Sequence, residues 1–221
     1  MWVKICGLTN EEDALAAVAL GADAVGFMFA PSPRQVTVGT ARDIARRLPY
    51  GVMTVGVFRD QAPGQVIDTM LSAGLHAAQL HGHETPNEAK VIRQKVQALI
   101  VAFPAGSQSI ERFDDYHADA LMIDAPNPGG GEVFDWTLAD GIPSNRRLIL
   151  AGGLTPMNVA EAIATVKPWG VDVSTGVEVE PGVKDPRRVL AFVRRAKAAF
   201  ADLERPVGDE TPGPFDWDEM D

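Results

Sequence analysis

Strand-like and helix-like stretches alternate along nearly the whole chain, and this alternation restricts the fold more than any other feature of the sequence. Short apolar runs recur about every 27 residues, and a stretch with helical features follows each of them. The expected strands cover residues 2–6, 24–29, 53–58, 77–81, 98–102, 120–124, 147–151 and 171–174.

Helical segments are expected after each of these strands. They begin near Thr9, Thr37, Pro63, Thr85, Ser107, Asp135, Thr155 and Asp185. At Thr85, Thr155 and Asp185 an oxygen-bearing cap residue precedes a proline, which is favoured at the first helical position. At the first segment, Thr9 with Glu12 three residues later predicts a capping box.

Repeated units of this kind form parallel sheets. The alternatives are a closed barrel and an open doubly wound sheet. The turn that contains Gly7 lacks the G-x-G-x-x-G pattern of an open dinucleotide-binding sheet, and the glycine-rich turns come after strands seven and eight. The sequence therefore predicts an α/β protein with a single (β/α)8 TIM barrel over residues 1–203.

The last segment, residues 204–221, differs in composition from the rest. It holds seven of the 30 acidic residues and one of the 20 basic residues, together with three prolines. This predicts a short acidic C-terminal tail without regular structure. Phe215 and Trp217 gain most from burial. We therefore expect them to dock on the barrel or on a neighbouring molecule, which would allow self-association.

Composition excludes several partners and compartments. A formal net charge of -10 disfavours nucleic acid, and no apolar run reaches the roughly 20 residues that span a membrane. The single cysteine cannot form an internal disulfide, and Met1 leads into a strand without an export pattern. We expect a cytoplasmic protein.

Two candidate proton-transfer groups lie at strand ends, which share one edge of a parallel barrel. Cys6 ends the first strand, and Asp124 ends the sixth with its side chain facing the interior. A thiolate, with a pKa of about 8.5, is a stronger base than a carboxylate, with a pKa of about 4. The two groups form an acid-base pair, although a lone cysteine is more often a buried hydrophobe and a loop aspartate is often solvated.

Two glycine-containing turns follow strands seven and eight. They contain Gly152 and Gly153 in the first turn, and Ser174, Thr175 and Gly176 in the second. Glycines let backbone amides approach phosphate oxygens closely, and this is the usual phosphate position in such barrels. The pair predicts a phosphate site.

Other polar residues are expected at the same edge. Lys4 faces the interior and needs an anion, either Asp172 or Asp124. Arg34, on a loop stiffened by two prolines, is a candidate for binding a carboxylate. His81 is expected to position other groups. No metal-ligand spacing occurs, so no metal is expected. The glycine-rich segment 125–132 predicts a lid.

The motifs in this order resemble the phosphoribosylanthranilate isomerase family of tryptophan biosynthesis. The resemblance rests on Lys4-Ile5-Cys6-Gly7-Leu8-Thr9, the segment from Gly26-Phe27 to Ser32-Pro33-Arg34, Val55-Gly56-Val57-Phe58, Gln79-Leu80-His81-Gly82, Phe134-Asp135-Trp136, Ala151-Gly152-Gly153-Leu154 and Asp172-Val173-Ser174-Thr175-Gly176-Val177-Glu178. It implies a cofactor-free Amadori rearrangement of a phosphosugar substrate, N-(5-phosphoribosyl)anthranilate.

The resemblance also implies roles for individual residues. Asp124 matches the general acid that opens the ribose ring, and Cys6 matches the base that removes the C2 proton. Arg34 matches the residue that grips the anthranilate carboxylate, while the turns around Gly152 and Ser174 match the phosphate cradle.

Some features depart from the family pattern and leave alternatives open. The expected lid contains Pro128-Gly129-Gly130-Gly131, whereas the family commonly has Gly-Gly-Thr-Gly. One alternative function is a dual-substrate sugar isomerase that also acts on the histidine-pathway aminoaldose, which needs a second phosphate site. The other is a non-catalytic barrel subunit that is recruited through its tail. Independently of the function, the tail is also expected to allow contact with a pathway enzyme.

Overall fold

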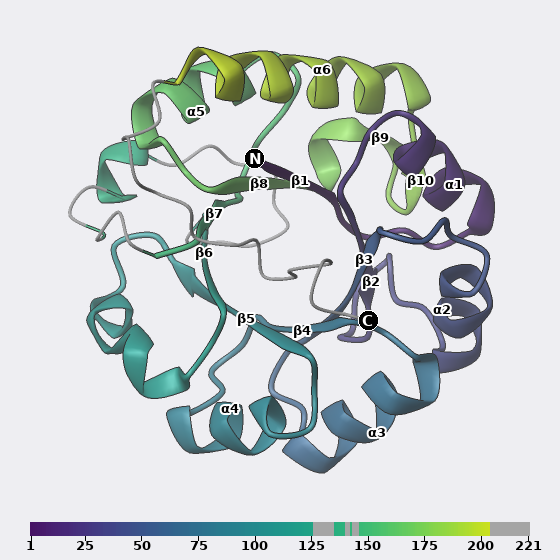
Figure 1. The fold of residues 1–221 in the computed structure, drawn as a ribbon, viewed down its shortest axis with the longest axis vertical. Coiled ribbons are helices and arrows are strands. Elements are labelled where there is room, and N and C mark those ends of the chain that lie inside the picture. Colours follow the sequence, from purple (N-terminus) through teal and green to yellow (C-terminus); the bar gives the residue numbers. More distant parts are fainter. Residues whose placement is uncertain (126–134, 140–141, 143–145, 204–221) are drawn as a thin grey trace.

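The barrel predicted from the alternation is the architecture of the protein. The computed structural model describes residues 1–125, 135–139, 142 and 146–203. Eight parallel strands follow one another in sequence order around a closed barrel, and β1 pairs with β8 to complete it. Helices surround the ring of strands (Figure 1). The (β/α)8 fold is therefore confirmed.

The barrel strands are β1 (Trp2–Ile5), β2 (Ala24–Met28), β3 (Met53–Phe58), β4 (Ala77–Leu80), β5 (Ala98–Pro104), β6 (Ala120–Asp124), β7 (Leu148–Leu150) and β8 (Gly170–Val173). The α-helices are α1 (Glu11–Ala19), α2 (Val38–Ala45), α3 (Pro63–Ala73), α4 (Pro86–Arg93), α5 (Val159–Val166) and α6 (Pro186–Asp202). The 3-10 helices of the described residues are η1 (Gln108–Tyr116), η2 (Trp136–Ala139) and η3 (Thr175–Val177).

Helix starts follow their capping residues, but the expected Thr9–Glu12 capping box and the expected start of α5 were wrong. Asn10, not Thr9, caps α1, because its side chain accepts from the amide of Asp13 at 2.8 Å while Thr9 Oγ1 donates to the carbonyl of Gly182 at 2.6 Å. α5 begins later than expected, because the Thr155 amide donates to Asn158 Oδ1 at 2.7 Å and forms a turn first.

The remaining starts agree more closely with the expectation. Thr85 and Glu88 form a capping box on α4, and Asp185 accepts from two amides of the first turn of α6. The segments expected near Ser107 and Asp135 are 3-10 helices rather than α-helices.

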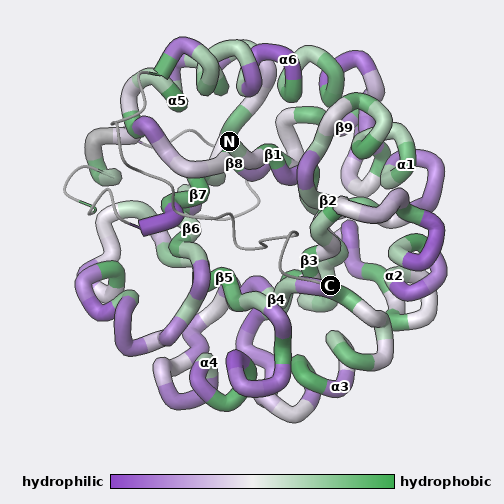
Figure 2. Tube along the Cα trace, in the orientation of Figure 1, coloured by the Kyte–Doolittle hydropathy of each residue, from purple (hydrophilic) through white to green (hydrophobic). Residues whose placement is uncertain are grey.

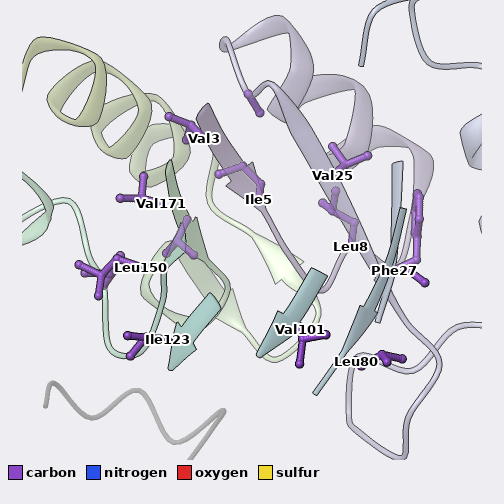
Figure 3. Close-up of a cluster of buried hydrophobic side chains, with 14 of the residues drawn as sticks. Val3, Ile5, Leu8, Val25, Phe27, Leu80, Val101, Ile123, Leu150 and Val171 are labelled. Atoms are coloured by element: carbon purple, nitrogen blue, oxygen red, sulfur yellow. The ribbon is translucent and has the colours of Figure 1, made fainter. Parts of the chain in front are cut away.

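Two apolar layers hold the barrel together. The outer layer packs alternate strand residues against the helices, and Figure 3 shows part of it, including Val3 and Val171 on adjacent strands. The inner layer lies inside the barrel and consists of Trp2, Ala24, Met53, Val55, Ala77, Ala98, Ile100, Ala102, Ala120, Met122, Ile149 and Ala151. Six of these twelve side chains are alanines, which leaves room for the long polar side chains of Lys4 and Gln79. Apolar residues concentrate on the strands in Figure 2 as well.

A small antiparallel hairpin between β8 and α6 was not predicted. It consists of β9 (Glu178–Glu180) and β10 (Val183–Lys184). The dipeptide Pro181-Gly182 is a strong turn signal that could have revealed it. The hairpin matters because Glu178 and Lys184 contribute to the site described below.

Some expectations fall outside the described residues. They are the acidic tail over 204–221 and, apart from Ala125, the lid expected over 125–132. Within the described part of the chain, no helix has the length and apolarity needed to cross a membrane.

Candidate active site

Cys6 lies directly after β1, at the carboxyl edge of the barrel. Its amide donates to the carbonyl of Val173 at 2.8 Å, which ties this turn to the end of β8. A Cβ on Gly26 would lie 2.7 Å from Cys6 Sγ and 3.1 Å from Lys4 Nζ, so this glycine leaves room for both groups. Burial raises the pKa of the Cys6 thiol, and the Lys4 ammonium partly opposes this effect.

Lys4 is paired with Asp172 inside the barrel. Lys4 Nζ donates to Asp172 Oδ1 at 2.9 Å, and their side chains are 0% and 9% exposed. Burial alone would lower the pKa of Lys4, but the Asp172 carboxylate and the Cys6 thiol more than offset it, and the pKa is raised. Lys4 therefore carries its charge directly beside the thiol.

Asp124 ends β6 with its carboxyl group held on two sides. Oδ1 accepts from the amide of Ala125 at 2.7 Å, and Oδ2 lies 3.0 Å from His81 Nε2. The direction of the ring nitrogen does not make this second contact a hydrogen bond. Gln79 Nε2 lies 3.0 Å from His81 Nδ1, the ring nitrogen that does not face Asp124, and so fixes the orientation of the imidazole.

The two glycine turns meet beside Asp124. They share a cavity of about 50 Å³ with Asp124, and its lining is Asp124, Ala125, Ala151, Gly152, Gly153, Leu154, Asp172, Val173, Ser174 and Thr175. Gly152 has φ +84°, and a Cβ there would overlap the amide of Ala125 and lie 2.8 Å from Asp124 Oδ1. The expected phosphate turns and the expected acid therefore line one space.

Gly176 allows the closest approach between the two turns. A Cβ at this position would overlap the carbonyl oxygen of Leu154, which belongs to the other turn.

We expect Gly176→Ala to force the turns apart and to weaken binding of inorganic phosphate about tenfold or more. Calorimetric titration would measure this. Ser109→Ala, at an exposed position of η1, is a control expected to bind as the wild type does. Unchanged affinity in Gly176→Ala would contradict the expectation.

Arg34 lies at this edge but is already paired. Its Nε donates to Glu178 Oε1 at 2.8 Å, and its Nη2 donates to Glu178 Oε2 at 2.7 Å. Lys184 Nζ donates to the same carboxylate at 2.7 Å. Sequence reasoning did not assign Glu178 or Lys184 to the site, because it missed the hairpin that carries them.

The turns after β3 and β4 are where the second phosphate of a dual-substrate isomerase would be expected to bind. Glu84 Oε1 and Oε2 accept from the amides of Asp60 and Gly82, each at 2.8 Å, and Asp60 Oδ1 accepts from the amide of His83 at 2.5 Å. These amides are therefore occupied by carboxylates, which also repel an anion. This arrangement weighs against a second phosphate site at these turns.

A larger hollow of about 320 Å³ lies at the opposite end of the barrel, beside residues that precede β3 and β4 such as Tyr50 and His76. Active sites in such barrels lie at the carboxyl edge, so we place the active site at the smaller cavity. Among the described residues, no group of three or more His, Cys, Asp or Glu side chains could hold a metal ion.

A (β/α)8 barrel with a thiol, a carboxyl group and a pair of glycine turns at its carboxyl edge defines a phosphate-binding barrel enzyme. The family model for N-(5'-phosphoribosyl)anthranilate (PRA) isomerase matches residues 3–195. This chain belongs to that family. Its activity is the isomerisation of phosphoribosylanthranilate in tryptophan biosynthesis.

Curated and solved relatives agree with this assignment. An N-(5'-phosphoribosyl)anthranilate isomerase from Desulforudis audaxviator is 47% identical over 205 residues, which cover 90% of this chain and 98% of the relative. The crystal structure of the Thermus thermophilus phosphoribosyl anthranilate isomerase is 40% identical, covers 90% of this chain and 99% of that chain, and superimposes with a TM-score of 0.83. A third structure, 39% identical with a TM-score of 0.80, covers 90% of this chain and 99% of that chain and is a complex with reduced 1-(o-carboxyphenylamino)-1-deoxyribulose 5-phosphate.

Proposed function

We propose that this chain performs the Amadori rearrangement of N-(5-phosphoribosyl)anthranilate with Asp124 as the general acid and Cys6 as the base. The observation that carries the proposal is the position of Asp124, whose carboxyl group lines the same cavity as the two glycine turns. A ribose phosphate held in those turns would have its ring close to this carboxyl group.

The first step opens the ribose ring. The C1–O4 bond breaks, Asp124 donates a proton to the departing ring oxygen, and the nitrogen lone pair forms a C1=N bond, which gives a Schiff base. Asp124 is suited to this step because the amide of Ala125 holds Oδ1 in place, while Oδ2 lies 3.0 Å from His81 Nε2.

The second step moves a proton on carbon. The Cys6 thiolate takes the C2 proton, and the C2–H electron pair forms a C1=C2 bond as the iminium nitrogen regains its lone pair. The resulting enolamine gains a proton at C1 and loses the proton of its C2 hydroxyl group, which gives the ketone. The Lys4 ammonium beside Cys6 stabilises the thiolate.

Substrate binding uses the two ends of the site. The backbones of Gly152, Gly153, Ser174, Thr175 and Gly176 would hold the phosphate. Arg34 would hold the anthranilate carboxylate with the edge of its guanidinium group that Glu178 leaves open. The solved relative that binds a reduced product analogue supports a phosphosugar substrate.

Turnover by the purified protein tests the proposal directly. Incubation with N-(5-phosphoribosyl)anthranilate is expected to yield one equivalent of the aminodeoxyribulose phosphate without added metal or cofactor. Failure to form this product would overturn the proposal. Product formation from the histidine-pathway aminoaldose at a comparable rate would favour the dual-substrate alternative, which the carboxylate-occupied amides after β3 and β4 disfavour.

Arg34→Ala is expected to act on the anthranilate half of the substrate. It removes the only proposed carboxylate contact, so affinity for the reduced product analogue should fall roughly 10- to 100-fold. Affinity for inorganic phosphate should change little. Calorimetric titration of both ligands measures the difference, with Arg112→Ala as an exposed control. An equal loss for both ligands would contradict the assignment.

The proposal extends to compartment and partners. The tryptophan-pathway activity and the single cysteine support a cytoplasmic location. One solved structure, from Thermotoga maritima, shows generated monomers of a dimeric phosphoribosylanthranilate isomerase. A dimer of this chain, and a contact of its tail with a second copy or a pathway enzyme, can be tested by measuring its mass in solution with and without residues 204–221.

A further inference from the structure

Three charged side chains form a buried cluster between the phosphate turns and the barrel edge. Arg34, Glu178 and Lys184 have side chains that are 11%, 4% and 1% exposed. The Glu178 carboxylate accepts from Arg34 Nε and Nη2 and from Lys184 Nζ, and it also accepts from the amide of Gly182 at 3.3 Å. One carboxylate is therefore shared by two basic side chains, and the formal charge of the cluster is +1. Burial lowers the pKa of Lys184, and the Glu178 carboxylate opposes this effect.

The geometry leaves the outer end of Arg34 available. Glu178 occupies the Nε–Nη2 edge of the guanidinium group, and no described residue accepts from Nη1. A second carboxylate can therefore bind at the Nη1–Nη2 edge in the usual bidentate geometry. An isolated Arg34–Glu178 pair would be neutral and would attract such a carboxylate weakly, whereas the cluster with Lys184 attracts it as a net cation.

The cluster also contacts the other half of the site. Lys184 Nζ donates to the carbonyl of Ser174 at 3.2 Å, and Ser174 begins the second phosphate turn. A Cβ on Gly7 would lie 2.6 Å from Arg34 Cδ and 2.9 Å from Ser174 Oγ, so Arg34 and this turn lie side by side.

The hairpin that carries the cluster is anchored on both sides. The Lys184 amide donates to Asp13 Oδ2 at 2.9 Å, and Thr9 Oγ1 donates to the carbonyl of Gly182. From α6, Arg188 donates to the carbonyl of Glu178. These contacts hold Glu178 and Lys184 in fixed positions against Arg34.

We propose that Lys184 and Glu178 are positioning residues for carboxylate recognition: Glu178 fixes the plane of the Arg34 guanidinium group, and Lys184 supplies the net positive charge that makes the cluster selective for an aromatic carboxylate substrate. This inference rests on the proposed role of Arg34. It assigns the specificity of the site to the missed hairpin as well as to the barrel strands.

The test compares two ligands that differ in one group. The probes are reduced 1-(o-carboxyphenylamino)-1-deoxyribulose 5-phosphate and the same compound with a plain phenyl ring. The affinity ratio is the affinity for the probe with the carboxylate divided by the affinity for the phenyl probe. It measures the contribution of the carboxylate, because both probes carry the phosphate. The variants are Lys184→Gln, which removes the charge and keeps hydrogen-bond donors, Lys184→Met, which removes both, and Lys184→Arg, which keeps the charge.

We expect Lys184→Gln and Lys184→Met to lower the affinity ratio roughly 10-fold, and Lys184→Arg to stay within about 2-fold of the wild type. In turnover the loss should fall on KM more than on kcat. An equal loss for both probes would mean that Lys184 only supports the phosphate turn, and the inference would be overturned. An unchanged ratio, or a loss in Lys184→Arg as large as in Lys184→Gln, would overturn it as well.

Arg34→Ala, measured with the same probes, separates this inference from the proposed function. If Arg34→Ala leaves the ratio unchanged, the proposed role of Arg34 is wrong. If Arg34→Ala lowers the ratio and neither uncharged Lys184 variant does, only the role of Lys184 is wrong.

Discussion

Cys6→Ser and Asp124→Asn are each expected to lower kcat by at least ~100-fold, the lower end of the range for removing a general base or acid. Serine keeps nearly the size of cysteine, but its hydroxyl group is a far weaker acid and does not supply the base. Asparagine keeps the shape of aspartate and has no transferable proton. Steady-state turnover with N-(5-phosphoribosyl)anthranilate measures both effects, and near-normal turnover in both variants would contradict the mechanism.

Stability and pH measurements show whether the loss of kcat comes from the missing proton-transfer group or from damage to the fold. Both variants should retain the wild-type midpoint of urea unfolding to within a small shift, because each substitution is nearly isosteric. Burial raises the pKa of the Cys6 thiol, so the thiolate is a minority at neutral pH and its fraction grows as pH rises. In Asp124→Asn the general acid no longer titrates, so the residual kcat/KM of this variant should increase with pH through the neutral range. A flat profile there would contradict Cys6 as the base.

Much of the fold could be predicted because the strands and several helix starts have local causes. The strand of residues 53–58 was located at both ends, since turn-forming Pro49 and Gly51 lie shortly before it and the polar pair Arg59-Asp60 follows it. The start of α5 was wrong because the amide and the hydroxyl group of Thr155 both donate to Asn158 Oδ1 and hold residues 155–158 in a turn. Such contacts depend on side-chain directions that spacing does not give.

The site was predictable where one element determines the position of a residue. Cys6 and Asp124 follow from strand ends and the alternation of side chains along a strand. The pairing of Arg34 with Glu178 joins residues 144 positions apart, and no local pattern reports a contact of that range. Only the Pro181-Gly182 turn pointed to the hairpin, and it gave no indication of the partner.

Asp172→Asn is expected to destabilise the protein by about 3–5 kcal/mol, the usual cost of removing one partner from a buried ion pair. Lys4 is fully buried, and Asp172 accepts its hydrogen bond at 2.9 Å. Without the carboxylate, the ammonium group loses its nearest opposite charge, while asparagine replaces only part of the hydrogen bonding.

Urea unfolding at several pH values, combined with a second substitution, tests this account of the interior. Loss of Asp172 lets burial depress the pKa of Lys4 below its unfolded value, so the unfolded chain then binds more protons than the folded one. The deficit of Asp172→Asn should consequently shrink as pH rises toward 10, whereas the raised pKa of Lys4 in the wild type contributes stability that is lost only above the unfolded value of 10.5. The double variant Lys4→Met/Asp172→Asn leaves no charge to compensate and should regain at least about half of the lost free energy of unfolding. If the double variant is no more stable than Asp172→Asn, the loss comes from packing or hydrogen bonding at position 172, and the buried charge of Lys4 is not its cause.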